Sequence, residues 1–179
     1  PAFDARKGAE ELLIHSGLDY TILRACVHEH IFVEMAAQVA EKGYATLAAA
    51  GDNRISPVPT TDLAMMAAAS LDLDAVRNQT IEVGGAEIMT ARAAFERACA
   101  VAGVTPEARV LPGPAVALGR RLGRPVRRYA HRLGEMHAWL SQEFVADPEA
   151  SGARFGIPLT SFDDALRAVK LLRPKAVIP

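Results

Sequence analysis

One stretch of the chain, residues 16–24 with the sequence SGLDYTILR, constrains the fold more than any other. Alanine, glutamate and leucine dominate residues 5–14, and these residue types favour a helix. Gly17 then offers the left-handed conformation that commonly ends a helix, because glycine has no Cβ that would clash. Residues 20–23 are aromatic, β-branched or aliphatic without a turn residue, which is typical of a buried strand. The stretch therefore predicts a helix that leads into a strand of an α/β fold.

The residues after this strand are where we expect any functional site. In an open parallel sheet, ligands bind beyond the carboxyl ends of the strands. Residues 24–30, with the sequence RACVHEH, occupy that position and bring together a guanidinium, a thiol and two imidazoles. Reactive side chains therefore begin where the apolar strand ends.

Several segments together resemble an atypical short-chain dehydrogenase/reductase of the NmrA-like, NAD(P)-binding group. They are residues 7–13 (KGAEELL) with 16–24, residues 51–58 (GDNRISPV) with 62–64 (DLA), and residues 155–158 (FGIP) with 161–164 (SFDD). The resemblance spans most of the chain but matches only the second half of such a protein. It implies the C-terminal part of a Rossmann-like, doubly wound parallel sheet with a small, mostly helical substrate lobe.

The resemblance also implies a division of the chain. Residues 1–111 would hold the C-terminal half of the NAD(P)-binding domain with part of the substrate lobe, and residues 112–179 a mostly helical C-terminal lobe. The sequence Pro112-Gly113-Pro114 interrupts regular structure and is the candidate linker.

Members of this family bind NADP or NAD through a glycine-rich turn after their first strand, where backbone N–H groups hold the pyrophosphate. Neither G-x-G-x-x-G nor G-x-x-G-x-x-G occurs in this sequence, and Gly84-Gly85 and the pair Gly119 and Gly123 have the wrong spacing. The chain is therefore either a fragment whose N-terminal half is missing or a chain that has lost the cofactor cradle. We favour the fragment, in which case residues absent from this chain bind most of the cofactor.

By resemblance, the intact protein would be an NAD(P)H-dependent oxidoreductase that reduces a small organic or quinone-like acceptor. Two alternatives stay open: a non-catalytic NAD(P)-sensing regulator of the same fold, and an interaction subunit that binds no nucleotide. Half of a doubly wound sheet would expose an apolar edge, so the last alternative predicts a homodimer or another protein partner.

The resemblance assigns roles to the residues that follow the first strand. Arg24, Ala25, Cys26 and Val27 would line the nicotinamide site, although Ala25 stands where the family usually has proline.

The next residues would face the substrate, namely His28, His30 and Phe32. A purely structural role for them is the alternative. The tripeptide His28-Glu29-His30 also suggests a metal site, but a third ligand at a recognisable spacing is missing, so we predict no metal.

Lys7 is the candidate catalytic residue, by resemblance to the family lysine that contacts the nicotinamide ribose. Phe3 and Lys7 have the Y-x-x-x-K spacing, but phenylalanine has no hydroxyl and cannot donate a proton. Counting back from Ser16 would place Arg6 there instead, an arginine that always stays charged. In both alignments the usual tyrosine acid is missing. The alternative is that Lys7 and Arg6 belong to a solvated helix face.

Composition limits the class of protein. A net charge of −1 argues against a dedicated nucleic-acid binder or a membrane-surface protein. The longest apolar stretch, around residues 63–71, is far shorter than the roughly 18–20 residues that span a bilayer. Because Cys26 and Cys99 are the only cysteines, a disulfide framework is not credible, and we expect a reducing, cytoplasmic setting. The family resemblance, in turn, implies a small-molecule substrate.

Hydrophobic periodicity and turn residues predict the remaining elements. Helices are expected at residues 30–43, 62–71 and 90–102, and strands at 44–49, 79–83 and 109–111. Residues 54–58 are expected to be extended, but Pro57 and Pro59 place them at a sheet edge or outside a ladder. The expected helix caps are Asp4, Thr60 or Thr61, and Ser161, with Asp62 at the positive end of its own helix dipole. Asp147-Pro148 is expected to end a helix, and Cys99 to lie in the core. The basic run over residues 120–132 predicts a solvated face, with an anion site as the alternative.

Overall fold

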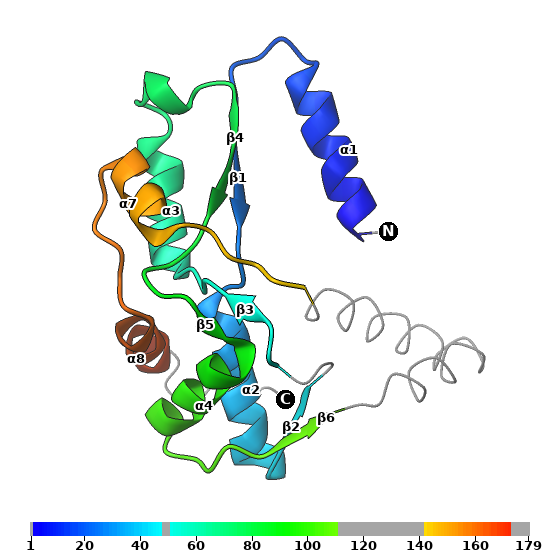
Figure 1. The fold of residues 1–179 in the computed structure, drawn as a ribbon, viewed down its shortest axis with the longest axis vertical. Coiled ribbons are helices and arrows are strands. Elements are labelled where there is room, and N and C mark those ends of the chain that lie inside the picture. Colours follow the sequence, from blue (N-terminus) through cyan, green and yellow to red (C-terminus); the bar gives the residue numbers. More distant parts are fainter. Residues whose placement is uncertain (1, 48–50, 111–141, 173–179) are drawn as a thin grey trace, which may run out of the picture.

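A computed structural model of the chain describes residues 2–47, 51–110 and 142–172 (Figure 1). The helices are α1 (Ala2–Ile14), α2 (Glu29–Lys42), α3 (Thr60–Ala69), α4 (Ala91–Ala102), α7 (Pro148–Phe155) and α8 (Phe162–Leu172), with a 3-10 turn η1 (Asp74–Val76). The strands are β1 (Thr21–Ala25), β2 (Ala45–Leu47), β3 (Arg54–Ile55), β4 (Gln79–Val83), β5 (Met89–Thr90) and β6 (Ala108–Val110).

The strands pair mainly in parallel. β1 pairs with β4 from Thr21 opposite Gln79 to Ala25 opposite Val83, so both strands end at the same level. β2 pairs in parallel with β6, whereas the short β3 and β5 are antiparallel. Helices α2 and α3 lie between β1 and β4 in sequence, as a parallel connection requires. The predicted α/β fold with a parallel sheet is confirmed.

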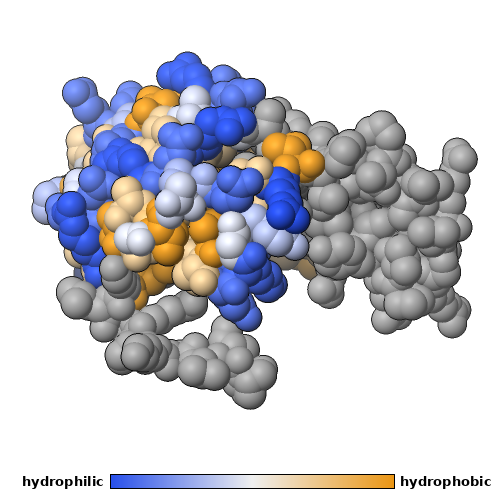
Figure 2. Space-filling view, turned by 90° about the horizontal axis from the view of Figure 1, so that it is seen from below, coloured by the Kyte–Doolittle hydropathy of each residue, from blue (hydrophilic) through white to orange (hydrophobic). Residues whose placement is uncertain are grey.

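Two clusters of buried side chains form the core. The first packs α2 against α4 and α8, and includes Phe32, whose ring meets that of Phe162 edge to face at 5.9 Å. The second packs the β1–β4 pair against α3 and α7 through residues such as Met66, Val83 and Phe155. Seen from the end where α2 and α4 lie, hydrophilic residues surround a small hydrophobic patch (Figure 2). Within the described residues, no helix has the length and apolar character needed to cross a bilayer.

Most local predictions are confirmed. Gly17 and Gly43 have the expected positive φ angles of 77° and 80°, and Gly43 ends α2. The strand over residues 79–83 is found with the predicted bounds. Thr90 caps α4 by accepting a hydrogen bond from the Ala93 N–H, and the hydroxyl of Ser161 accepts one from the Asp164 N–H at 3.2 Å. Cys99 is fully buried in the first cluster, as predicted.

Two cap predictions and one prediction of a helix end are wrong. α1 begins at Ala2, so Asp4 lies within the helix rather than at its N-cap. α3 has Pro59 at its N-cap and already includes both threonines, and no side chain caps it from that position. Asp147 does not end a helix but begins α7, where its carboxylate accepts hydrogen bonds from the Glu149 and Ala150 N–H groups.

Other predictions fall outside the described residues. These are the linker Pro112-Gly113-Pro114, the basic run over residues 120–132, and the last two residues of the strand predicted at 44–49. The proposed boundary between residues 111 and 112 also lies outside the described residues and stays a prediction.

Gly84 and Gly85 follow β4 where the backbone passes very close to the segment after β3. A Cβ on Gly84 would lie 2.6 Å from the Cβ of Ser56, and one on Gly85 would overlap the carbonyl oxygen of Pro57 and lie 2.9 Å from its carbonyl carbon. Both contacts are shorter than packed atoms tolerate, so neither position has room for a side chain.

This close approach gives a test of the fold. We expect Gly85→Ala to lower the free energy of unfolding by about 3 kcal/mol or more, because backbone atoms cannot yield as a side chain can. Gly8→Ala is the matched control, since no atom lies within 4 Å of its added Cβ and the site is helical. We expect it to be neutral or to stabilise by up to about 1 kcal/mol. The measurement is urea unfolding of both variants and the wild type. Equal unfolding midpoints for Gly85→Ala and Gly8→Ala would contradict the described packing.

Candidate functional site

Three segments converge at the carboxyl ends of β1 and β4. The chain after β1 is joined to β4 by a hydrogen bond from the Cys26 N–H to the Val83 oxygen, at 2.9 Å. The chain after β3 is joined to the same place by the Val58 N–H, which donates to the Val27 oxygen at 2.9 Å. This is the position where ligands bind in open parallel sheets, as the sequence predicted.

Two buried hydroxyls connect this end of the sheet with α7 and with the segment before it. The Ser56 hydroxyl donates to the Ala146 oxygen at 3.1 Å and accepts from the Ala146 N–H at 2.9 Å. The Ser151 hydroxyl accepts from the Gly84 N–H at 3.2 Å and donates to the Asp147 oxygen at 2.8 Å. Sequence reasoning missed both serines, because their partners lie far away along the chain.

Two buried carboxylates hold the starts of neighbouring elements. Glu29, in the first turn of α2, accepts from the N–H and the hydroxyl of Thr60, at 3.0 and 3.1 Å. Asp62, fully buried in α3, accepts from the N–H and the hydroxyl of Thr160, at 2.8 and 2.7 Å. The prediction that Asp62 mainly serves its own helix is therefore incomplete, since its oxygens fix the segment before α8.

Cys26 is half-buried at the end of β1. Burial raises the pKa of its thiol, an effect larger than the opposing hydrogen bonds to the Ala146 backbone and to Ser56. The thiol is therefore neutral at physiological pH and is not an activated nucleophile. Burial likewise raises the pKa of Cys99, which lies in the core.

His28 and His30 lie together at the start of α2. Their rings stack with centroids 5.5 Å apart and an interplanar angle of 21°. His28 occupies the N-cap position, but its side chain makes no capping hydrogen bond. Its Nδ1 atom is buried and has no hydrogen-bond partner among the described residues. Within the same residues, no group of three metal-ligating side chains occurs.

The other predicted site residues lie in different surroundings. Val27 and Phe32 are 1% and 3% exposed and belong to the core, where packing accounts for them. Arg24 points to α1, where its guanidinium contacts the Glu10 carboxylate at 2.7 Å and lowers the pKa of that carboxyl. Lys7, also on α1, is solvated and lies 4.0 Å from Glu11. The structure thus brings Cys26, His28 and His30 to the sheet end, and Lys7 and Arg24 to the α1 side of β1.

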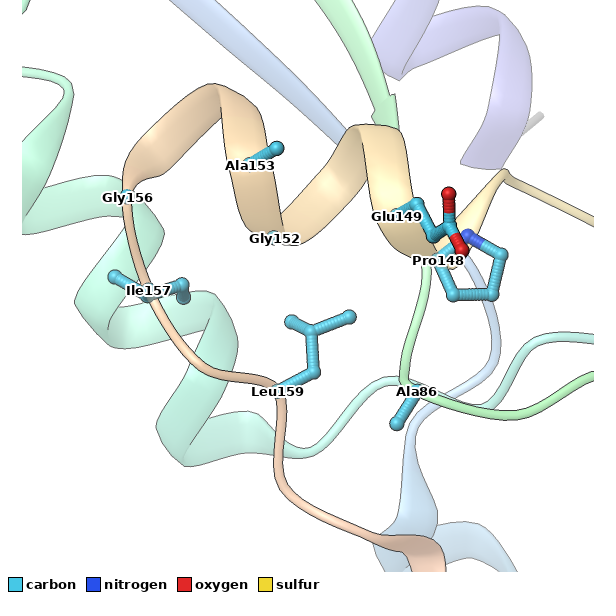
Figure 3. A pocket seen from close by; sticks show the side chains of 8 residues that line it. All are labelled: Ala86, Pro148, Glu149, Gly152, Ala153, Gly156, Ile157 and Leu159. Atoms are coloured by element: carbon cyan, nitrogen blue, oxygen red, sulfur yellow. The ribbon is translucent and has the colours of Figure 1, made fainter.

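A cavity of about 570 Å³ lies beside the segment after β4 (Figure 3). It is lined by Ala86, Pro148, Glu149, Gly152, Ala153, Gly156, Ile157 and Leu159. Its lining is mostly apolar and comes from α7, from the segment after α7 and from the β4–β5 connection. Glu149 contributes its one charged side chain.

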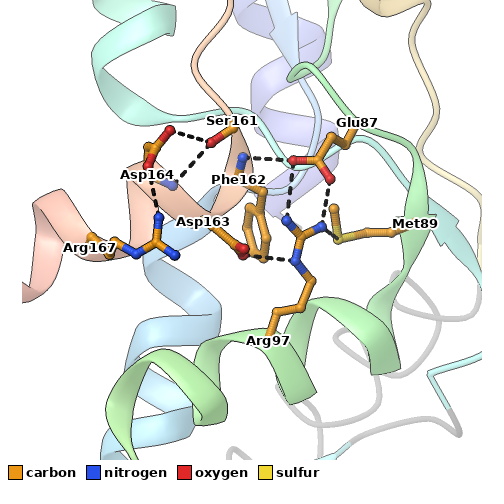
Figure 4. Close-up of polar contacts among 8 residues, drawn as sticks. All are labelled: Glu87, Met89, Arg97, Ser161, Phe162, Asp163, Asp164 and Arg167. Carbon is orange, nitrogen blue, oxygen red and sulfur yellow. Dashed lines mark hydrogen bonds and ion pairs between the residues drawn. The ribbon is translucent and has the colours of Figure 1, made fainter.

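A cluster of polar contacts fixes the connection that leads away from Gly84 and Gly85 (Figure 4). The Arg97 guanidinium contacts Glu87 at 2.6 Å and Asp163 at 2.8 Å, and lies 5.4 Å from the centre of the Phe162 ring. Glu87 also accepts the Phe162 N–H at 3.0 Å, so it caps α8 from outside the helix. Arg97 thereby joins the β4–β5 connection, α4 and α8.

The fold is similar to that of solved nucleotide-binding enzymes. An NADPH-dependent quinone oxidoreductase from Escherichia coli matches 93% of this chain and 61% of its own, with a TM-score of 0.73 and 20% identity. Its complex with NADPH matches 90% of this chain and 57% of its own, with a TM-score of 0.70 and 20% identity. A nucleoside-diphosphate-sugar epimerase from Staphylococcus aureus matches 90% of this chain and 56% of its own, with a TM-score of 0.68 and 15% identity.

These likenesses show the fold. The chain has part of a Rossmann-like α/β fold and spans about three fifths of the length of the proteins it matches. No known protein-family profile and no curated protein sequence matches the chain.

The cluster around Arg97 predicts a pH dependence of stability. The Arg97 guanidinium lowers the folded-state pKa of Glu87 below its unfolded value of about 4.3. The resulting stabilisation is therefore complete above that value and is lost as the pH falls through the lower, folded-state pKa. We expect the urea midpoint of Glu87→Gln to lie below that of the wild type at pH 7, and the gap to narrow as the pH falls below that unfolded value. Glu149→Gln, on α7, is the control, and a gap that stays constant with pH would contradict this assignment.

Proposed function

We propose that this chain is the acceptor-side half of an NAD(P)H-dependent oxidoreductase, related to the NmrA-like group, that reduces a small quinone-like molecule. One observation carries the proposal: more than nine tenths of the chain matches an NADPH-dependent quinone oxidoreductase, at a TM-score of 0.73. The match to the same kind of enzyme complexed with NADPH supports it. The sequence resemblance noted above points to the same class independently.

The residues at the sheet end fit the nicotinamide part of such a cofactor. The buried Nδ1 atom of His28 has no described partner, and a buried polar atom of this kind costs about 1–3 kcal/mol unless something satisfies it. A bound amide or carbonyl group would do so. The pyrophosphate part has no counterpart here, because the sequence contains no glycine-rich cradle. When bound, the reduced nicotinamide supplies the hydride for the reaction.

The chain's own residues would position the acceptor and keep water away. His28 and His30 present two stacked, half-buried imidazoles, a flat surface suited to a planar ring. Cys26 and Ala25 form the floor at the end of β1, and the neutral thiol leaves that floor weakly polar. Lys7 stays the candidate for a ribose contact, since α1 runs back along β1 and its first half lies towards the carboxyl end of β1 (Figure 1).

Nucleotide binding is the first test of this function. We expect protein made from the whole reading frame to bind NADPH and to oxidise it when a soluble quinone is added. Binding without turnover would favour the regulator alternative, which the missing tyrosine acid also favours. If neither NADPH nor NADH binds, the proposed function is wrong.

The histidine pair gives a residue-level prediction. We expect His28→Ala and His30→Ala each to raise the KM for the quinone roughly three- to tenfold, the loss of one hydrogen bond or stacking contact. His15→Ala is the matched control, because His15 is exposed at the end of α1 and bonds only locally to the Glu11 oxygen. Steady-state kinetics at saturating NADPH measure the effect. Equal KM values in all variants would remove the pair from the acceptor site.

Cys26 offers a readout that needs no turnover. Because burial raises its pKa, its alkylation rate should keep rising above the pKa of a free thiol, about 8.5. We expect saturating NADP to slow this alkylation several-fold by covering the end of β1. A Cys26→Ser variant should lose the labelling, since Cys99 is fully buried. Unchanged labelling with bound NADP would place the nicotinamide elsewhere.

A further inference from the structure

Three segments form the cavity beside the end of β4, and hydrogen bonds hold them in place (Figure 3). The first, α7, is joined to the end of β4, because the Ser151 hydroxyl accepts a hydrogen bond from the Gly84 N–H at 3.2 Å. The second, the stretch after α7, turns back along the helix at Gly156, whose φ angle is 65°. Its Ile157 N–H donates to the Gly152 oxygen at 3.1 Å, so the stretch stays close to α7.

The far ends of the other two segments are fixed as well. The stretch after α7 leads to Thr160, whose N–H and hydroxyl donate to the buried Asp62 carboxylate at 2.8 and 2.7 Å. The third segment, the β4–β5 connection, begins at the tightly packed Gly85 and continues to Glu87, which contacts Arg97 at 2.6 Å. Closing the cavity would require breaking these contacts. The cavity is therefore formed before any ligand binds, as small-molecule sites usually are.

The lining suits the apolar part of a small molecule. Ile157 and Leu159 are only half-buried, although both pack against the second core cluster, and Pro148 adds a third apolar side chain. The volume of about 570 Å³ lies within the range of roughly 300–1,000 Å³ that small-molecule sites have. An apolar cavity of about 150 Å³ holds one benzene molecule, so this one has room for two fused rings with a short side chain.

One carboxylate in the lining lacks a partner. Within the described part of the chain, neither a hydrogen bond nor an ion pair engages the Glu149 carboxylate, and Glu149 is the one charged residue of the lining. The positive end of the α7 dipole is already offset by Asp147, whose carboxylate accepts hydrogen bonds from the Glu149 and Ala150 N–H groups. The Glu149 carboxylate therefore adds negative charge beside an apolar surface, and a cation complements it.

We propose that this cavity binds a small apolar molecule that carries one ammonium group. Its apolar body lies against Pro148, Ile157 and Leu159, and its ammonium group lies beside the Glu149 carboxylate (Figure 3). None of these residues belongs to the proposed cofactor or acceptor site. The cavity is therefore a second site, and its occupation does not depend on the proposed function.

The test compares naphthylethylamine with naphthylethanol, two probes of nearly the same shape of which only the amine is charged at neutral pH. Protein made from the whole reading frame, labelled on isoleucine and leucine methyl groups, is titrated with each probe and followed by NMR. We expect saturable shifts at Ile157 and Leu159, with a Kd on the order of 1 mM or below, but none at the buried Ile55 and Leu166. The amine should bind roughly two- to fivefold more tightly than the alcohol, the effect of a solvent-exposed ion pair.

A charge-removing variant locates the ammonium group. Glu149→Gln should abolish the preference for the amine and leave the affinity for the alcohol unchanged. Glu96→Gln is the matched control, since Glu96 is also an exposed helical glutamate but does not line the cavity. It should keep the preference of the wild type.

Several outcomes would overturn the inference. They are equal affinities of the two probes for the wild type, an unchanged preference in Glu149→Gln, shifts only at residues other than Ile157 and Leu159, and the absence of saturation by either probe. A protein that shows the expected preference but does not bind NADPH would refute only the proposed function.

Discussion

Buried polar side chains that satisfy backbone N–H groups of distant segments hold the carboxyl end of the sheet together. The carboxylates of Glu29 and Asp62 accept hydrogen bonds from the N–H groups of Thr60 and Thr160, respectively. The Ser56 hydroxyl accepts one from the Ala146 N–H. A buried N–H left without a partner costs about 1–3 kcal/mol, so each of these contacts strongly favours one arrangement of two segments. The elements would form without them, but their relative positions at the site would not be fixed.

These contacts accompany a close approach of two backbone segments at the end of the sheet. With Ser56 fixed against Ala146, the segment after β3 lies so close to β4 that only glycine fits at residues 84 and 85. The surroundings of Cys26 on this side therefore consist of backbone and small side chains, which have few alternative conformations. Against that background the Nδ1 atom of His28 is informative, because it is buried and has no hydrogen-bond partner among the described residues.

Sequence reasoning succeeded for features that depend on residues close together in the sequence. Gly17, Gly43, the strand at residues 79–83, the helix start at Thr90 and the cap Ser161 depend on neighbours within a few positions, and all are found close to where they were predicted. It failed where the partner is remote. Asp62 at a helix start looks like a dipole residue, but its oxygens bind Thr160, which is 98 residues away. The residues next to Asp62 in the sequence are compatible with either role, so no local pattern could distinguish them.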